Sequence, residues 1–96
     1  MIRLDEKARP APDAVVTELD NGEAVLLHLQ TKMYYTLNET GVRIWQLLNE
    51  GLSAGEISVK IHGEFDVTPE KAQESVIRLF HELSQEKLIE LITPPL

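Results

Sequence analysis

Residues Met33 to Gly41 read MYYTLNETG and join a short strand to a helix start with almost no loop between them. The aromatic and β-branched side chains favour a strand, and Asn38 is a favoured residue at a helix N-cap. A strand beside a helix leaves an exposed sheet edge next to a groove, a geometry that captures an extended peptide as an added strand. The stretch therefore indicates a binding module rather than an enzyme.

Two further strands are predicted before this stretch. Val15, Thr17 and Leu19 alternate with Val16 and Glu18, and residues 23–29 are again strand-like. Asp20-Asn21-Gly22 between them supplies residues that tolerate positive φ, as a hairpin turn requires. A second turn over residues 30–32 leads into the strand at residues 33–37. We expect a three-stranded antiparallel meander whose last strand lies at an edge.

Three helices are predicted after the strands, each with its own start signal. Asn38 can cap the first helix, and Ser53 with Glu56 forms a capping box for the second. Thr68 followed by Pro69 opens the third and longest helix, because proline at the first helical position loses no needed N–H. The third helix is expected to continue to about residue 86.

Glycines mark the expected ends of the first two helices. Gly51 follows a helix that runs to about Asn49, and Gly63 is expected to stop the second helix. Two helices joined by a short glycine-containing turn and attached to a small sheet make a winged helix-turn-helix. The predicted fold class is α+β, a winged helix-turn-helix with a three-stranded antiparallel sheet followed by three helices.

The two ends of the chain carry weaker signals. Residues 1–13 are polar, contain Pro10 and Pro12 and show no periodicity, so they are expected to form a flexible or surface-lying arm. Residues 88–92 are apolar and could add a strand or cover the core. The predicted organisation is an arm over residues 1–13, a domain over 14–92 and a C-terminal tail over 93–96.

Composition limits the classes of function. The 96 residues suit one small domain, and the absence of cysteine excludes disulfides and thiolate chemistry. No apolar run is long enough to span a membrane and the first residues lack a signal-peptide pattern, so we expect a cytoplasmic protein that does not bind membranes. The net charge of −7 repels phosphate backbones and suits a partner with basic character.

The fold class usually reads DNA, but the charge of the last helix argues against nucleic acid as a partner. A helix in the major groove needs basic and amide side chains that face bases and phosphates. The charged residues of this helix and its end are mostly acidic: Glu70, Glu74, Glu82 and Glu86 against Lys71, Arg78 and Lys87. A winged-helix DNA-binding regulator remains an alternative, as does a structural adaptor of a modification complex.

One residue of the last helix departs from its hydrophobic pattern. The core stripe at helical spacing is Ala72, Val76, Leu79 and Leu83 with Phe80 on its flank. Ile77 falls off this stripe among polar neighbours such as Glu74 and His81, so it either packs under the sheet or lines a groove between the helix and the strand edge. A single exposed apolar residue is also ordinary on a protein surface.

Alternation divides the strand at residues 33–37 into two faces. Met33, Tyr35 and Leu37 are expected to face the core, because Leu37 directly precedes a helix cap. Tyr34 would then stand on the outer side, where an aromatic ring with a polar tip suits recognition. Both tyrosines could instead be cross-strand partners that stabilise the meander, and the two interpretations are compatible.

No catalytic or cofactor-binding group is predicted. His28, His62 and His81 lack the spacing of metal ligands, so we expect no metal site, and His81 is better interpreted as a groove donor or an exposed residue. The serines fall in helical contexts without a nucleophile elbow, and no glycine-rich phosphate loop occurs. The sequence therefore predicts no catalytic residues and no cofactor.

These motifs together resemble the PqqD family. The matching segments are 16–29 (VTELDNGEAVLLHL), 34–41 (YYTLNETG), Ile44-Trp45, Leu47-Leu48, Gly51, Glu56-Ile57, Phe65-Asp66-Val67 and Leu79 to Leu88. The run Leu37-Asn38-Glu39-Thr40 between strand and helix is fairly specific for the family. The resemblance covers about residues 15–91 and is strongest to the stand-alone members of lasso-peptide biosynthesis, the B1 proteins.

The resemblance implies a non-catalytic recognition element that binds the leader peptide of a ribosomally made precursor. In that family the leader adds an antiparallel strand to the third strand and packs on the third helix. The implied edge is Lys32, Met33, Tyr34, Tyr35 and Thr36, and the implied helical wall is Glu74, Ile77, Arg78 and His81. The implied partners are the precursor leader, a cysteine-protease-like leader peptidase and an ATP-dependent cyclase.

Overall fold

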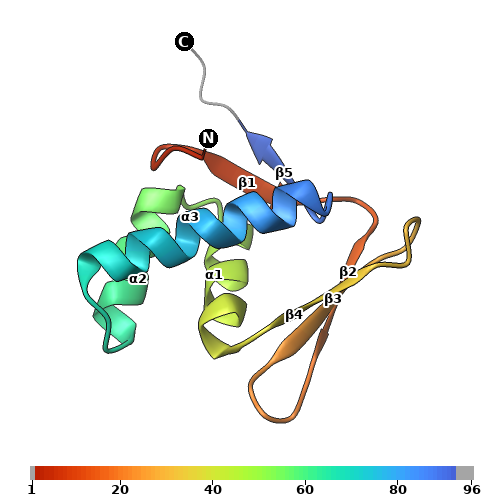
Figure 1. Ribbon diagram of the computed structural model, residues 1–96, viewed down its shortest axis with the longest axis horizontal. Helices are drawn as coiled ribbons and strands as arrows, with labels where there is room; N and C mark the ends of the chain where they lie inside the picture. Colours follow the sequence, from red (N-terminus) through yellow and green to blue (C-terminus); the bar gives the residue numbers. More distant parts are fainter. Residues whose placement is uncertain (1, 93–96) are drawn as a thin grey trace.

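The computed structural model describes residues 2–92, which form two small antiparallel sheets and three helices. In chain order the elements are β1 (Lys7–Pro10), β2 (Ala14–Glu18), β3 (Ala24–His28), β4 (Tyr34–Leu37), α1 (Glu39–Asn49), α2 (Ala54–Glu64), α3 (Pro69–Gln85) and β5 (Ile89–Ile92). Figure 1 shows the sheet β2–β3–β4 projecting from one side of the helices, while β1 and β5 lie together on another side. The predicted C-terminal tail, residues 93–96, lies outside the described residues.

The three-stranded meander and the three helices confirm the predicted α+β winged helix-turn-helix. Gly22 adopts φ +85° in the turn between β2 and β3, as the hairpin pattern predicts. The turn between β3 and β4 places Lys32 at φ +63°, a left-handed conformation that is uncommon for a residue other than glycine. Leu26 pairs with Tyr35 and Ala24 with Leu37, so β4 is held by its whole length against β3.

All three predicted helix starts are confirmed. The Asn38 side chain accepts a hydrogen bond from the Gly41 N–H at 2.8 Å, and the Thr68 side chain accepts one from the Lys71 N–H at 3.2 Å. Ser53 and Glu56 form the reciprocal capping box, with bonds of 2.8 and 3.2 Å. These bonds satisfy N–H groups that have no partner inside a helix.

One of the predicted helix ends is wrong. Gly51 follows α1 at φ +89°, where glycine is free of the steric cost of a Cβ atom. Gly63, in contrast, lies inside α2, which continues to Glu64 and ends at the extended residue Phe65. The last turn of α2 is held by packing and by the Arg43–Glu64 ion pair to α1, with Nε and Oε1 2.7 Å apart.

The expectation of a flexible N-terminal arm is corrected by the structure. β1 pairs antiparallel with β5, and Ile2 and Ala8 are buried in the core. The carbonyl oxygens of Leu4 and Glu6 accept the N–H groups of Gly55 and Ala54 at 2.7 and 2.8 Å, so this segment also caps the start of α2. The apolar segment after α3 thus adds a strand, but to β1 rather than to the three-stranded sheet.

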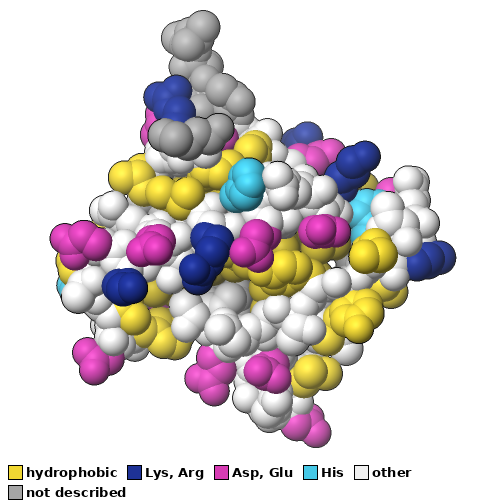
Figure 2. All heavy atoms as spheres, viewed as in Figure 1, with side chains coloured by type: hydrophobic (Ala, Val, Ile, Leu, Met, Phe, Trp, Pro, Cys, Tyr) yellow, Lys and Arg dark blue, Asp and Glu magenta, His cyan; other side chains and the backbone are white. Residues whose placement is uncertain are grey.

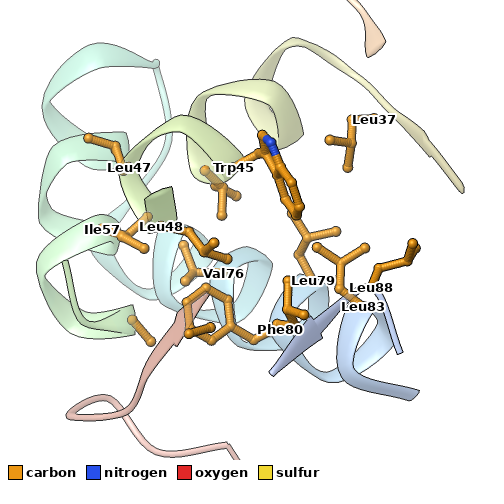
Figure 3. Packing of buried hydrophobic residues seen from close by; sticks show 14 of the residues in the cluster. Leu37, Trp45, Leu47, Leu48, Ile57, Val76, Leu79, Phe80, Leu83 and Leu88 are labelled. Atoms are coloured by element: carbon orange, nitrogen blue, oxygen red, sulfur yellow. The ribbon is translucent and has the colours of Figure 1, made fainter. Parts of the chain in front are cut away.

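The core lies between the helices and the inner faces of both sheets. Figure 3 shows side chains of α1, α2 and α3 converging, with Trp45 directed toward Leu79 and Phe80 packed beneath them. Phe80, Val76 and Leu83 are fully buried, so the predicted stripe of α3 is the core face. Within residues 2–92, no helix has the length and apolar character needed to cross a bilayer.

Candidate binding site at the β4 edge

β4 is an edge strand whose outer side carries unpaired backbone groups. Among residues 2–92, no strand pairs with that side of β4, because β5 pairs with β1. The His28 N–H donates to the Met33 carbonyl at 2.9 Å, and bonded pairs alternate along an antiparallel ladder. The backbone groups of Tyr34 and Thr36 therefore face away from β3, toward the open edge.

The turn that leads into β4 is held by a buried histidine. His28 is 6 % exposed, and its Nδ1 atom lies 3.2 Å from the Gln30 N–H and 3.3 Å from the Thr31 N–H. Nδ1 is placed to accept hydrogen bonds from both backbone N–H groups. The Lys32 N–H donates to the His28 carbonyl at 2.8 Å, which closes the turn. Sequence reasoning treated His28 only as a possible metal ligand and missed this role.

The side chains of β4 alternate as predicted, with one exception. Tyr34 is 70 % exposed and Thr36 is exposed, whereas Tyr35 is half-buried and Leu37 is buried. Met33 was expected on the core side but is 57 % exposed, because it lies in the turn ahead of β4 rather than in the strand. Lys32 is exposed in the same turn. The edge thus presents Tyr34 on the outer side and Tyr35 toward α3.

A cleft of about 340 Å³, the β4 cleft, separates β4 from α3 and reaches the start of α1. Its walls include Tyr35 and Leu37 on β4 and a set on α3: Ser75, Arg78, Leu79 and Glu82. The Tyr35 hydroxyl donates a hydrogen bond to the Glu82 carboxylate and so bridges the two walls. This arrangement gives an added peptide strand a mixed apolar and charged surface to pack against.

The Tyr35–Glu82 bridge perturbs the tyrosine. Burial, the hydrogen bond to Glu82 and the charge of that carboxylate together raise the pKa of Tyr35 to about 12, while the nearby Arg78 charge opposes the shift. Burial and a neighbouring anion both disfavour the phenolate form. Tyr35 is therefore neutral and able to donate at neutral pH.

The four wall residues implied by the family resemblance lie together, but most of them do not face β4. Glu74, Ile77, Arg78 and His81 line a second cleft of about 480 Å³ with Ile2 of the N-terminal segment, which we name the Ile2 cleft. Only Arg78 also lines the β4 cleft. Ile77 was expected to pack under the sheet or to line a groove between α3 and the strand edge. It is partly buried against the core and lines the Ile2 cleft, which no residue of β4 lines.

Sequence reasoning missed the α3 residues that face β4. Ser75, Leu79 and Glu82 are spaced at i, i+4 and i+7 and so share one side of the helix. Leu79 was assigned to the core, where it is 8 % exposed, and Glu82 was counted only as a charge that repels DNA. The spacing was visible in the sequence, but the angle at which α3 crosses the sheet was not.

The surface around α3 is divided into charged and hydrophobic parts. Figure 2 shows a row of charged side chains of both signs along α3, with hydrophobic surface on either side of that row. Glu74 and Arg78 of α3 are both exposed. A peptide strand on β4 would lie against this helix, since β4 and α3 are already joined through Tyr35 and Glu82.

The histidines are dispersed over the fold. His28 sits beneath the β3–β4 turn, the His62 ring contacts the Val67 carbonyl at 2.8 Å, and His81 lines the Ile2 cleft. In the described part of the chain, no three His, Asp or Glu side chains gather in the manner of a metal site.

Fold and site together define a class: a small winged-helix domain with an open sheet edge beside its third helix. The family model of the coenzyme PQQ synthesis protein D (PqqD) matches residues 23–89, and the chain belongs to this family. The match includes β4 and α3, which face each other across the β4 cleft, but not Ile2 of the second cleft. No curated protein matches the sequence.

Two solved structures are similar to this chain. TbiB1 in complex with the TbiA(beta) leader peptide is 34 % identical, with a TM-score of 0.77 over 85 % of this chain and 94 % of that chain. A lasso peptide synthetase B1 complexed with the leader peptide is 26 % identical, with a TM-score of 0.79 over 88 % of this chain and 98 % of that one. Each similarity spans nearly the whole of the other protein.

Proposed function

We propose that this protein is a recognition element for the leader peptide of a ribosomally synthesised, lasso-type precursor. The leader adds to β4 as an antiparallel strand and packs on α3. The observation that carries the proposal is the outward-facing backbone of Tyr34 and Thr36 beside the β4 cleft. The two similar structures, both complexes with leader peptides, support the same function.

The proposed peptide-binding residues fall into two groups. The edge group includes Tyr34 and Thr36, whose outward backbone groups would bond to the peptide, and the helix group supplies side-chain contacts. The edge group is Lys32, Met33, Tyr34, Tyr35 and Thr36, and the helix group is Glu74, Ile77, Arg78 and His81. To the helix group the geometry adds Ser75, Leu79 and Glu82, which face β4 across the cleft.

Energetics require both groups. Strand addition makes a few backbone hydrogen bonds of about 1 kcal/mol net each, whereas ordering a disordered peptide costs roughly 2–5 kcal/mol or more. Each buried apolar anchor contributes about 1.5–3 kcal/mol. Backbone bonds alone therefore barely offset the ordering, so the clefts must supply the affinity and the choice of peptide.

We further propose that the bound leader is delivered to a cysteine-protease-like leader peptidase and then to an ATP-dependent cyclase, with no reaction catalysed by this chain. Such a pathway places the protein in the cytoplasm. The family resemblance and the B1 proteins among the similar structures support this part of the proposal. Mixing the protein with the peptidase and precursor should accelerate leader cleavage, and an unchanged cleavage rate would contradict delivery.

Calorimetric titration with the TbiA(beta) leader peptide tests the proposed function. We expect saturable one-to-one binding with a Kd of roughly micromolar or below, and no binding of a scrambled peptide of the same composition. Equal heats for both peptides would contradict sequence-dependent recognition. A mobility shift of a DNA duplex at low salt by the same sample would instead favour the winged-helix regulator.

A further inference from the structure

β2 is the edge of the three-stranded sheet that peptide addition at β4 leaves unused. Val15 and Val16 are each 42 % exposed, and they point to opposite faces of the strand. The sheet projects from the helices (Figure 1), and within residues 2–92 no strand pairs with the outer side of β2. β2 thus presents apolar side chains on both of its faces beside an unpaired backbone.

β2 lacks the features that usually protect an edge strand. Natural edges carry lysine, proline, a bulge or an inward-facing charge, each of which prevents pairing with another chain. β2 contains neither lysine nor proline, and its register with β3 runs from Ala14 to Glu18 without a bulge. Its one charged residue, Glu18, stands at the end of the strand. β2 can therefore accept another strand without a change in its own structure.

The backbone of β2 defines what an added strand must offer. The bonds at both ends of the β2–β3 ladder make Ala14, Val16 and Glu18 face away from β3. The Ala14 N–H already donates to the Ala11 carbonyl at 3.0 Å, so Ala14 offers only its carbonyl. A fitting strand therefore needs a donor opposite Ala14 and both a donor and an acceptor opposite Val16.

We propose that β2 pairs antiparallel with β2 of a second copy of this chain, with Val16 on the twofold axis. In this register the two Val16 residues exchange a pair of backbone bonds, and each Glu18 N–H donates to the Ala14 carbonyl of the other copy. The strand is thus its own complement, and a symmetric contact of this kind closes as a dimer. The inference is independent of the proposed function.

Charge selects this register over the neighbouring one. With Val16 on the axis, the Cα atoms of the two Glu18 residues lie about 14 Å apart. With Thr17 on the axis, the same two atoms lie about 8 Å apart, and each carboxylate stands opposite a valine. The like charges repel at the shorter distance, whereas the longer distance exceeds the screening length of about 8 Å at physiological salt. The Val16 register also sets valine opposite valine, and such cross-strand pairs stabilise adjacent strands.

The dimer leaves both peptide-binding edges open. Pairing through β2 joins the two sheets in the order β4–β3–β2–β2–β3–β4, so both copies of β4 stay at the ends of one sheet. At about 4.8 Å between neighbouring strands, the two β4 strands lie about 24 Å apart. One dimer can therefore carry two peptides.

The dimer is expected to be weak and to strengthen with salt. One short strand pair joins an area below the roughly 1,200 Å² of a stable interface, so we expect half-association at roughly 0.1–1 mM chain. Each copy carries a net charge of −7, and salt screens the repulsion between the two copies. A cationic partner on β2 would show the opposite dependence on salt.

Sedimentation equilibrium of the full chain without any peptide, up to about 1 mM and at low and high salt, tests the dimer. We expect the average mass to rise from 10.9 kDa toward twice that value, more steeply at high salt. Val16→Lys sets two cations opposite each other on the axis and should weaken association at least tenfold. Val59→Lys, at a 71 %-exposed valine of α2, is the matched control and should associate like the unmodified chain. A mass of 10.9 kDa under all conditions, or equal association of the two variants, would overturn the proposal.

Disulfide trapping tests the register, because the chain contains no cysteine of its own. With Val16 on the axis, the Cα atoms of two Val16→Cys residues lie about 5.5 Å apart, which suits a disulfide, whereas those of two Thr17→Cys residues lie about 8 Å apart, which does not. We expect Val16→Cys to cross-link at least tenfold faster under mild oxidation. Equal rates, or a faster rate for Thr17→Cys, would overturn the Val16 axis.

Addition of saturating TbiA(beta) leader peptide separates this dimer from one formed through β4. We expect the cross-linking rate of Val16→Cys to stay the same, because the peptide and the second copy use opposite edges of the sheet. Loss of cross-linking on peptide binding would overturn the proposal and leave the proposed function standing.

Discussion

The sheet β2–β3–β4 has two edges, and they differ in what lies beside them. At β2, the Leu19–Glu23 and Leu29–Asp13 bonds of 2.8 and 2.9 Å mark the bonded pairs, so the backbone of Val16 faces outward just as that of Thr36 does at β4. Of the two edge strands, as far as residues 2–92 show, β4 alone is joined to α3 by a side-chain hydrogen bond, from Tyr35 to Glu82. The two edges therefore differ in the side chains that an added strand would meet.

The difference between the edges follows from energetics. Both edges offer hydrogen bonds to any extended chain, and such bonds carry no information about side chains. The β4 edge adds a cleft in which alternate side chains of an added strand can be buried. If the proposed function is right, α3 determines which peptide binds and at which edge. The following substitutions separate the contribution of the β4 backbone from that of α3.

The largest effect is expected from proline at the β4 edge. Thr36→Pro removes an outward N–H and places a ring where the peptide backbone would lie, while the bonds from β4 to β3 are kept. We expect binding of the TbiA(beta) leader peptide to weaken roughly 30-fold or more, because a hydrogen bond and close approach are both lost. Val16→Pro makes the same change at β2 and should leave the affinity unchanged, with similar small losses in thermal stability. Equal losses of affinity in both variants would show that β4 is not the binding edge.

The next largest effect is expected at the turn that presents β4. His28→Leu removes the acceptor of two backbone N–H groups, so unfolding by urea should show a loss of about 1–2 kcal/mol. Peptide affinity should fall as well, because residues 30–33 no longer hold the start of the edge in place. Asn21→Ala, in the turn between β2 and β3 where Asn21 accepts the Glu23 N–H at 3.1 Å, should reduce stability alone. An unchanged affinity in His28→Leu would show that this turn does not position β4 for peptide binding.

A smaller effect is expected from the bridge between β4 and α3. Tyr35→Phe removes the hydrogen bond to Glu82 and should cost about 1 kcal/mol of stability at neutral pH. Since the folded-state pKa of Tyr35 is raised to about 12 from an ordinary 10, the contribution of the hydroxyl is fully present below pH 10 and is lost as the pH rises toward 12. Urea unfolding of both proteins across this range should show the difference between them disappear. A difference that persists at pH 12 would mean that the bridge does not depend on the neutral hydroxyl.

The smallest effect is expected at the ridge between the clefts. Arg78→Ala should weaken peptide binding only about two- to fourfold at low salt, since an exposed ion pair contributes less than about 1 kcal/mol. The loss should disappear near 1 M salt, where the screening length is about 3 Å. Lys60→Ala, on the exposed surface of α2, is the control and should change neither affinity nor its salt dependence. A loss that is independent of salt would assign Arg78 a packing role instead of a charge role.

Most of the local structure could be predicted because its causes are local. The caps at Asn38, Ser53 and Thr68 act within three residues, and the alternation at Tyr34 to Leu37 needs only the neighbouring side chains. These patterns were sufficient to predict the fold class and the open edge at β4.

The features that the sequence did not predict depend mostly on contacts between distant parts of the chain. The sequence predicted a flexible or surface-lying arm in place of β1 because its partner β5 lies about eighty residues away. Pro10 also argued against a strand, although its nitrogen points away from β5 and would make no bond to it. Ile77 was assigned to the β4 side because the crossing angle of α3 is set by packing of the whole core rather than by any local pattern. The sequence did not indicate the role of His28, because nothing in it distinguishes a buried histidine that accepts hydrogen bonds from a turn from a histidine on the surface.

Hydrogen exchange of backbone amides, measured with and without the TbiA(beta) leader peptide, tests strand addition at β4 most directly. The amides of Tyr34 and Thr36 face the open edge and should become strongly protected on binding, while the amides of Val16 and Glu18 at the β2 edge keep their exchange rates. Saturated binding with Tyr34 and Thr36 still exchanging freely, or with protection at β2 instead, would contradict the account.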